Sequence, residues 1–324
     1  MSSLDNIKKT IETEMAEFET YFGKIMQSDI PLLKIILNYI YRRKGKQMRP
    51  LLVFLTAKLN GVISEQTYVA ATFIELLHTA SIVHDDVVDE SGERRGVLSI
   101  NALWNSKTAV LVGDYLLSKG LLIGIEKNCY GMLEIISESG KKMIEGELLQ
   151  LQKSRKRYIS ESDYLRIIHG KTAALISACT ACGAQSVIDN TDVIQIMKEF
   201  GENIGIAFQI KDDILDYENT GFTGKPSGND IKEGKITLPL IHALSQAPSL
   251  KKQRIVTIVK SRKKTSSEIS ETVNFVSEYG GLEYAKLRMN QYRDKALAML
   301  DVYPESDVKN SLKEFIYYTT ERKK

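Results

Sequence analysis

The strongest structural signal in this sequence is Leu76-Leu77-His78-Thr79-Ala80-Ser81-Ile82-Val83-His84-Asp85-Asp86-Val87-Val88-Asp89-Glu90, followed by Arg94-Arg95-Gly96. Its apolar residues recur at helical spacing, and no Pro or Gly interrupts it before Gly92. In a helix, Asp85 and Asp89 stack on one face with Asp86 beside them, and neighbouring carboxylates repel one another. The stretch therefore predicts a helix whose acidic end is either solvated or held together by a hard cation.

A second copy of this pattern lies in Phe208-Gln209-Ile210-Lys211-Asp212-Asp213-Ile214-Leu215-Asp216. Carboxylates again occur at i, i+1 and i+4 within a helical apolar pattern, and two such sets rarely arise by chance. The donors are all oxygens, with no Cys or His at metal spacing. This chemistry is typical of Mg²⁺, which binds through a few carboxylates, waters and substrate phosphates. We expect the two sets to face one another across the mouth of a cavity.

The two aspartate sets resemble the motifs of the trans-polyprenyl diphosphate synthases, in particular the long-chain, octaprenyl diphosphate synthase-like members. Further segments match that family in the same order: Gly45-Lys46-Gln47-Met48-Arg49-Pro50, Gly113-Asp114, Gly146-Glu147, Lys171-Thr172, and Gly224-Lys225-Pro226-Ser227-Gly228-Asn229-Asp230 leading to Gly234-Lys235. The resemblance covers residues 40–245, and beyond them it is only general.

The composition is that of one large soluble protein. With 324 residues, of which 43% are hydrophobic, the chain can bury a large core, and no linker or repeat divides it. We therefore expect a single polyprenyl synthase domain over residues 1–324. The net charge of +3 is small and the basic residues are dispersed, so nucleic acid is not an expected partner. Asp114 and Lys119 interrupt the most apolar stretch, residues 109–125, well short of the about 20 residues that cross a bilayer.

Three cysteines, Cys129, Cys179 and Cys182, form an odd set in a chain without a signal peptide, which suits a reducing cytosol. We therefore expect a cytoplasmic protein, or one loosely associated with a membrane. Cys179 and Cys182 lie in an Ala-rich helical segment with no second Cys pair, which favours close helix packing over a metal or redox pair.

The fold class expected is all-α. Apolar periodicity predicts helices over residues 4–26, 30–43, 64–90, 106–127, 130–155, 160–183 and 189–217, with further helices between 235 and 322 broken near 246–248 and at 280–281. No βαβ alternation or hairpin signal occurs. The glycine-rich residues 217–234 are expected to form a lid whose lysines close over phosphate. The resemblance implies a bundle of ten or more helices around a deep apolar cavity, usually homodimeric.

Five residues are candidates for substrate binding. Pro50 suits the first position of a helix, so Lys46 and Arg49 should lie at a helix N-terminus, where an anion is favoured. The resemblance assigns this pair, with His78, to isopentenyl diphosphate. A guanidinium group can donate two parallel hydrogen bonds to phosphate oxygens. The resemblance implies that Arg94 binds the allylic diphosphate and that Arg95 binds isopentenyl diphosphate. For His84 two roles are equally plausible: it could orient the neighbouring aspartates, or it could only pack against other side chains.

The resemblance implies a prenyl transfer. Two or three Mg²⁺ ions, bound by Asp85, Asp89, Asp212 and Asp216, would make the allylic diphosphate (geranyl or farnesyl) a leaving group. The double bond of isopentenyl diphosphate would then attack the allylic cation. A break at Gly170-Lys171-Thr172 would free a carbonyl to face that cation. The candidate catalytic residues are Asp85, Asp86, Asp89, Asp212, Asp213, Asp216, Lys171, Thr172, Gln209, Lys225 and Lys235.

Two features set the product length expected. Ser81 lies one turn before Asp85 and should line the cavity, and the family places a gate at Ala80 and Ser81, both small here. The product should pass them and stop near Leu77, Met132 or Ile136. We therefore expect about eight isoprene units (about C40), built for quinone side chains and handed to membrane enzymes. A shorter-chain synthase, a terpene cyclase and a non-catalytic subunit of a heteromeric synthase are the alternatives.

Overall fold

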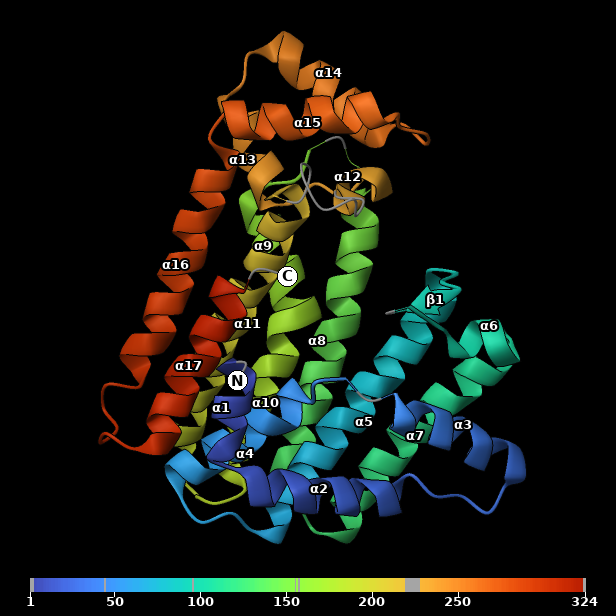
Figure 1. Cartoon of the computed structure of the whole chain (residues 1–324), viewed down its shortest axis with the longest axis vertical. Helices are drawn as coiled ribbons and strands as arrows, with labels where there is room; N and C mark the ends of the chain where they lie inside the picture. The colour runs from blue at the N-terminus through green and yellow to red at the C-terminus, as the bar shows by residue number, and fades with distance from the viewer. Residues whose placement is uncertain are drawn as a thin grey trace. The chain divides into compact units, whose positions relative to one another are not determined.

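The computed structural model describes residues 3–43, 45–94, 96–154, 156, 158–218 and 228–322. Its elements, in order, are α1 Ser3–Lys9, α2 Glu12–Ile25, α3 Pro31–Arg42, α4 Met48–Asn60, α5 Glu65–Val88, β1 Glu93–Arg94, β2 Val97–Leu98, α6 Ile100–Trp104, α7 Ser106–Glu126, α8 Tyr130–Ser154, α9 Glu161–Ile168, η1 His169–Ala173, α10 Ala174–Gln185, α11 Thr191–Glu218, α12 Asn229–Glu233, α13 Leu238–Gln246, α14 Ser249–Lys260, α15 Ser266–Glu278, α16 Gly281–Met299 and α17 Asp307–Glu321 (Figure 1). The prediction of an all-α fold with ten or more helices is confirmed.

The chain divides into two compact units. Unit one comprises Met1–Gly140, Ala178–Lys198 and Glu305–Leu312, and unit two comprises Lys141–Ser177, Glu199–Pro304 and Lys313–Lys324. Several of the boundaries fall inside helices, among them α8, α10 and α11. The single domain and its central cavity stay predictions.

Unit one is built around α4 and α5. Every residue of α4 from Pro50 to Ala57 is buried, as expected of a helix that is apolar on all sides. Helix α5 packs along α7 (Figure 1), and the two helices approach closely because glycines on α7 receive side chains of α5. A Cβ on Gly113 would lie 2.1 Å from His84, and one on Gly120 would lie 2.4 Å from Phe73.

Helix α7 is, among the described residues, the one helix long and apolar enough to cross a membrane by length and composition. The expectation that this apolar stretch is too short to cross a bilayer was therefore wrong, since α7 has 21 residues. Core helices of soluble proteins meet the same criterion. The face of α7 that includes Val112 and Leu116 is buried in the structure.

Unit two holds a second core. One cluster joins Tyr164 and Ile168 to residues of α11, including Ile210 and Ile214. Another cluster fills the space among α13, α14 and α15, where α14 and α15 lie side by side (Figure 1).

Four local expectations were wrong. The helix expected over residues 4–26 is interrupted before α2, because Ile11 has φ −136° and ψ 32°. Residues 93–98 form an antiparallel pair, Glu93 with Leu98 and Arg94 with Val97, too short for an alternating pattern to reveal. Part of the expected lid is helical, as α12. Helix breaks at residues 261–265 and 300–306 were not predicted.

Candidate active site

The first aspartate set ends helix α5 in unit one. The N–H of Asp89 donates to the carbonyl of Asp85 (2.8 Å) and closes the last turn. Asp86 is buried, with 4% of its surface exposed, whereas Asp85 is half-buried and Asp89 is exposed. The side chain of Asp86 therefore lies in the interior of unit one, while the carboxylates of Asp85 and Asp89 remain accessible to a cation.

His84 lies between the first aspartate set and α7. Its Nε2 is 3.2 Å from the carbonyl oxygen of Val110 and 3.5 Å from Oδ1 of Asp114. The ring fills the space over Gly113. Of the two roles left open by the sequence, these contacts favour packing.

The predicted substrate-binding residues also belong to unit one. Arg49 is the second residue of α4, so its predicted place at a helix N-terminus is confirmed, although Pro50 is third and not first. Lys46 is exposed and His78 is half-buried. Arg94 lies in β1, and Arg95 lies outside the described residues.

The predicted chain-length residues lie on α5 and α8. Ala80, Leu77, Met132 and Ile136 are buried, and the half-buried Ser81 donates its hydroxyl to the carbonyl of His78 (2.9 Å). All five are in unit one, as a shared wall requires, and their role as a gate stays a prediction.

The second aspartate set lies near the end of α11 in unit two, and its three carboxylates have different partners. Asp212 pairs with the guanidinium of Arg322. Asp216 accepts from the backbone N–H groups of Asn229 (3.1 Å) and Asp230 (2.9 Å), and so anchors the start of α12.

Asp213 is enclosed in a hydrogen-bonded network. It accepts from the hydroxyl of Tyr164 (2.6 Å) and from Nε2 of Gln209 (3.0 Å), while the hydroxyl of Thr172 donates to Oε1 of Gln209 (2.8 Å). Burial raises the pKa of Asp213 to about 8, with a further contribution from the charge of Asp230. The structure thus brings together the predicted residues Thr172, Gln209 and Asp213.

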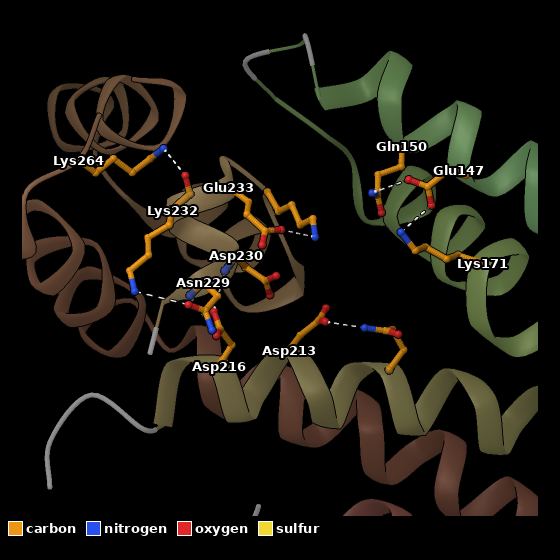
Figure 2. Close-up of polar contacts among 12 residues, drawn as sticks. Glu147, Gln150, Lys171, Asp213, Asp216, Asn229, Asp230, Lys232, Glu233 and Lys264 are labelled. Atoms are coloured by element: carbon orange, nitrogen blue, oxygen red, sulfur yellow. Dashed lines mark hydrogen bonds and ion pairs between the residues drawn. The ribbon is translucent and has the colours of Figure 1, made fainter. Parts of the chain in front are cut away.

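Lys171 and Thr172 belong to η1, a π-helical turn in which Ala174 N–H reaches back to the carbonyl of His169. The predicted break is confirmed as this wide turn. The turn lies against α8, since a Cβ on Gly146 would be 2.8 Å from the backbone nitrogen of Lys171. Lys171 forms an ion pair with Glu147, drawn in Figure 2, in which Nζ is 2.5 Å from Oε2.

A pocket of about 140 Å³ in unit two collects most of these groups. Its lining includes Lys171, Thr172, Gln209, Asp213, Asp230 and Lys235. Lys235 Nζ is 2.5 Å from Oε2 of Glu233. Asp213 and Asp230 approach one another from α11 and α12 (Figure 2).

The electrostatics of unit two favour a cation beside these acids. Burial and then the charge of Asp216 raise the pKa of Asp230 to about 6. Within the described part of the chain, no three His, Cys, Asp or Glu side chains enclose a metal by themselves. Mg²⁺ commonly needs only one or two carboxylates beside substrate phosphates. The carboxylate of Asp212 already pairs with the positively charged guanidinium of Arg322. Its oxygen atoms are therefore suited to bind a cation such as Mg²⁺.

One predicted site residue lies outside the described part of the chain, and three residues of the site were not predicted. Lys225, the predicted lid lysine, lies outside the described residues. Tyr164, Asp230 and Arg322 were missed as site residues. Asp230 stands inside a quoted motif, whereas Tyr164 and Arg322 carry no local signal, because their partners lie 49 and 110 residues away.

The known proteins most similar to this chain in sequence belong to one family. A family model described as Polyprenyl synthetase matches residues 30–276. The octaprenyl diphosphate synthase of Haemophilus influenzae is 32% identical over 99% of this chain and 98% of its own. The all-trans-nonaprenyl-diphosphate synthase (geranyl-diphosphate specific) of Rhodobacter capsulatus is 34% identical over 95% of this chain and 94% of its own.

Solved structures agree with this result. A polyprenyl synthase from Caulobacter crescentus CB15, complexed with calcium and isoprenyl diphosphate, has TM-score 0.89 and 32% identity, covering 98% of both chains. A decaprenyl diphosphate synthase from Rhodobacter capsulatus has TM-score 0.93 and 31% identity, again over 98% of both chains. A geranylgeranyl pyrophosphate synthase from Bacteroides thetaiotaomicron has TM-score 0.84 and 39% identity, covering 99% of this chain and 100% of its own.

Proposed function

The chain belongs to the polyprenyl synthetase family of prenyltransferases, and we propose that it joins isopentenyl diphosphate to an allylic diphosphate, repeatedly, to make a long-chain trans-polyprenyl diphosphate. The relatives named octaprenyl and nonaprenyl diphosphate synthase support a long product. The observation that carries the proposal is the network of Thr172, Gln209 and Asp213 beside Lys171, which places candidate catalytic groups in one pocket.

The residues of unit two suit the first step of this reaction. Lys171 and Lys235 bring ammonium groups to the pocket, where they would bind a diphosphate. The carbonyl oxygen of Gln209 would face positive charge on the allylic carbon. Asp212 and Asp216, with Asp85 and Asp89 of unit one, would hold Mg²⁺, which supplies charge neutralisation of the leaving diphosphate when bound. The calcium in the Caulobacter crescentus complex supports a divalent ion.

Assembly, location and pathway are further parts of the proposal. Helix α7 exposes Leu111, Leu122 and Ile125, with 60%, 54% and 51% of their surfaces accessible, and a second copy of the chain would cover them in a homodimer. All three cysteines are buried and form no disulfide with one another, which suits a reducing cytoplasm. A long polyprenyl product is consistent with transfer to membrane enzymes and with quinone side chains.

One observation favours a shorter-chain synthase as the second candidate. The geranylgeranyl pyrophosphate synthase from Bacteroides thetaiotaomicron is 39% identical to this chain, above the long-chain relatives named here. One experiment separates the two. The purified protein is incubated with labelled isopentenyl diphosphate, farnesyl diphosphate and Mg²⁺, and the product is sized. A product of about eight units supports the long-chain proposal, and a product of four units supports the alternative.

A further inference from the structure

A line of three hydrogen bonds joins Tyr164 to Thr172 inside unit two. The Tyr164 hydroxyl donates to Oδ2 of Asp213 (2.6 Å), and Nε2 of Gln209 donates to Oδ1 of the same carboxylate (3.0 Å). The Thr172 hydroxyl donates to Oε1 of Gln209 (2.8 Å). Three separate elements, α9, η1 and α11, therefore meet through side chains that line one pocket.

This line fixes which way the Gln209 amide points. Nε2 of Gln209 donates to Oδ1 of Asp213, so the amide nitrogen of Gln209 faces Asp213. The carbonyl oxygen of Gln209 then faces Thr172, which occupies one of its two lone pairs. The second lone pair is available to a positive charge in the pocket. Turning the amide over would break its present bonds with Thr172 and Asp213.

Tyr164 occupies a place that packing alone would give to phenylalanine. Only 3% of its surface is exposed, and its ring lies in the cluster that contains Ile168, Ile210 and Ile214. An apolar cluster gains nothing from a hydroxyl, and a buried hydroxyl without a partner is costly. The bond to Asp213 is therefore the physical reason for tyrosine at this position.

We propose that Tyr164 is a positioning residue for the prenyl transfer, acting through Asp213 to aim the Gln209 carbonyl at the reacting allylic carbon. The inference rests on the proposed function, since it needs an allylic cation in this pocket. Tyr164 does not touch the substrate in this scheme, so its loss should lower the rate of the chemical step and leave substrate binding almost unchanged.

Tyr164→Phe tests the proposal because it removes only the hydroxyl. We expect kcat to fall about tenfold or more, with KM for isopentenyl diphosphate within about twofold of wild type. Tyr284→Phe is the matched control, because Tyr284 packs against the same cluster of unit two and its hydroxyl donates instead to Oε2 of Glu161 (2.6 Å), which does not line this pocket. The control should keep kcat within about twofold.

A double-mutant cycle with Gln209→Ala distinguishes positioning from a loss of stability. If Tyr164 acts through Gln209, then Tyr164→Phe combined with Gln209→Ala should have the same kcat as Gln209→Ala alone. Tyr284→Phe should combine additively with Gln209→Ala. An active wild type in which the kcat effects of Tyr164→Phe and Gln209→Ala multiply, or in which Tyr164→Phe leaves kcat unchanged, would overturn the positioning role. A wild type that makes no product from any allylic diphosphate would overturn the proposed function as well.

Discussion

The guanidinium of Arg322 donates to the carboxylate of Asp212, and its carbon Cζ lies 4.3 Å from the centre of the Phe208 ring. Arg322 follows α17, and Phe208 stands one turn before Asp212 on α11. A cation from the end of the chain thus rests on the first carboxylate of the second aspartate set, held from one side by an aromatic face.

Arg322→Gln should therefore change metal binding. A guanidinium on Asp212 competes with a divalent ion, so its removal should lower the concentration of Mn²⁺ or Mg²⁺ at half-saturation by about threefold to tenfold. Calorimetric titration of the substrate-free protein measures this directly. Arg254→Gln is the control, because Arg254 pairs with Glu271 on the exposed surface of unit two. Equal affinities in wild type and Arg322→Gln would show that the pair does not compete with metal.

Both aspartate sets should be needed for turnover. Asp85→Ala and Asp212→Ala should each lower kcat by several orders of magnitude, because each removes an accessible carboxylate from a site that must neutralise a diphosphate. Circular dichroism should remain that of the wild type, since neither residue is buried. Near-normal turnover in either variant would contradict a metal site built from two sets.

Ala80→Phe should shorten the product. Ala80 is fully buried on α5, and if it forms the tunnel wall an aromatic ring there would block the growing chain. The expected product has about three or four isoprene units, made by an active enzyme. Product sizing by chromatography checks this. An active, folded variant whose product has the wild-type length would rule out the gate.

The close approach of α8 to η1 should depend on Gly146. A Cβ there would meet the Lys171 nitrogen at 2.8 Å and the Gly170 Cα at 3.1 Å, both backbone atoms that cannot turn aside. Gly146→Ala should therefore destabilise the fold by about 1–3 kcal/mol, measured by denaturant unfolding. Gly140→Ala on the same helix is the control, since its nearest contact would be 3.7 Å and alanine favours helix. A Gly146→Ala variant as stable as Gly140→Ala would contradict the contact.

Asp213 should make stability depend on pH. Burial raises its pKa from 3.8 to about 8 in the folded chain. The folded state therefore holds a proton that the unfolded state releases, and this group lowers stability as pH rises from about 4 to about 8. Asp213→Asn should remove that slope, as followed by unfolding at several pH values without metal. An unchanged slope would contradict a raised pKa.

The periodicity of the sequence was sufficient for the helices, because burial repeats along each of them. Helix α5 was predicted as residues 64–90 and spans Glu65–Val88. Periodicity did not reveal the break at Ile11 or the two-residue strands, whose conformations depend on single dihedral angles and on contacts across a turn.

The site was predictable by residue type but not by partner. The spacing of Asp212, Asp213 and Asp216 predicted three similar carboxylates. In the structure one pairs with an arginine, one is buried beneath a tyrosine, and one anchors a short helix. These differences come from residues distant in sequence, for which a local pattern holds no information.

The π-helical turn of η1 has a consequence for how the protein responds to heat. A π turn is less favourable than a regular helical turn, so neighbouring contacts must hold it. Here they include the pair between Nε2 of His169 and Oε1 of Glu202 (2.8 Å) and that between Lys171 and Glu147 (2.5 Å). When these pairs open, residues 169–173 should exchange their amide hydrogens before α9 does. Local opening of this turn, at temperatures below global melting, would then set the upper temperature at which the enzyme works.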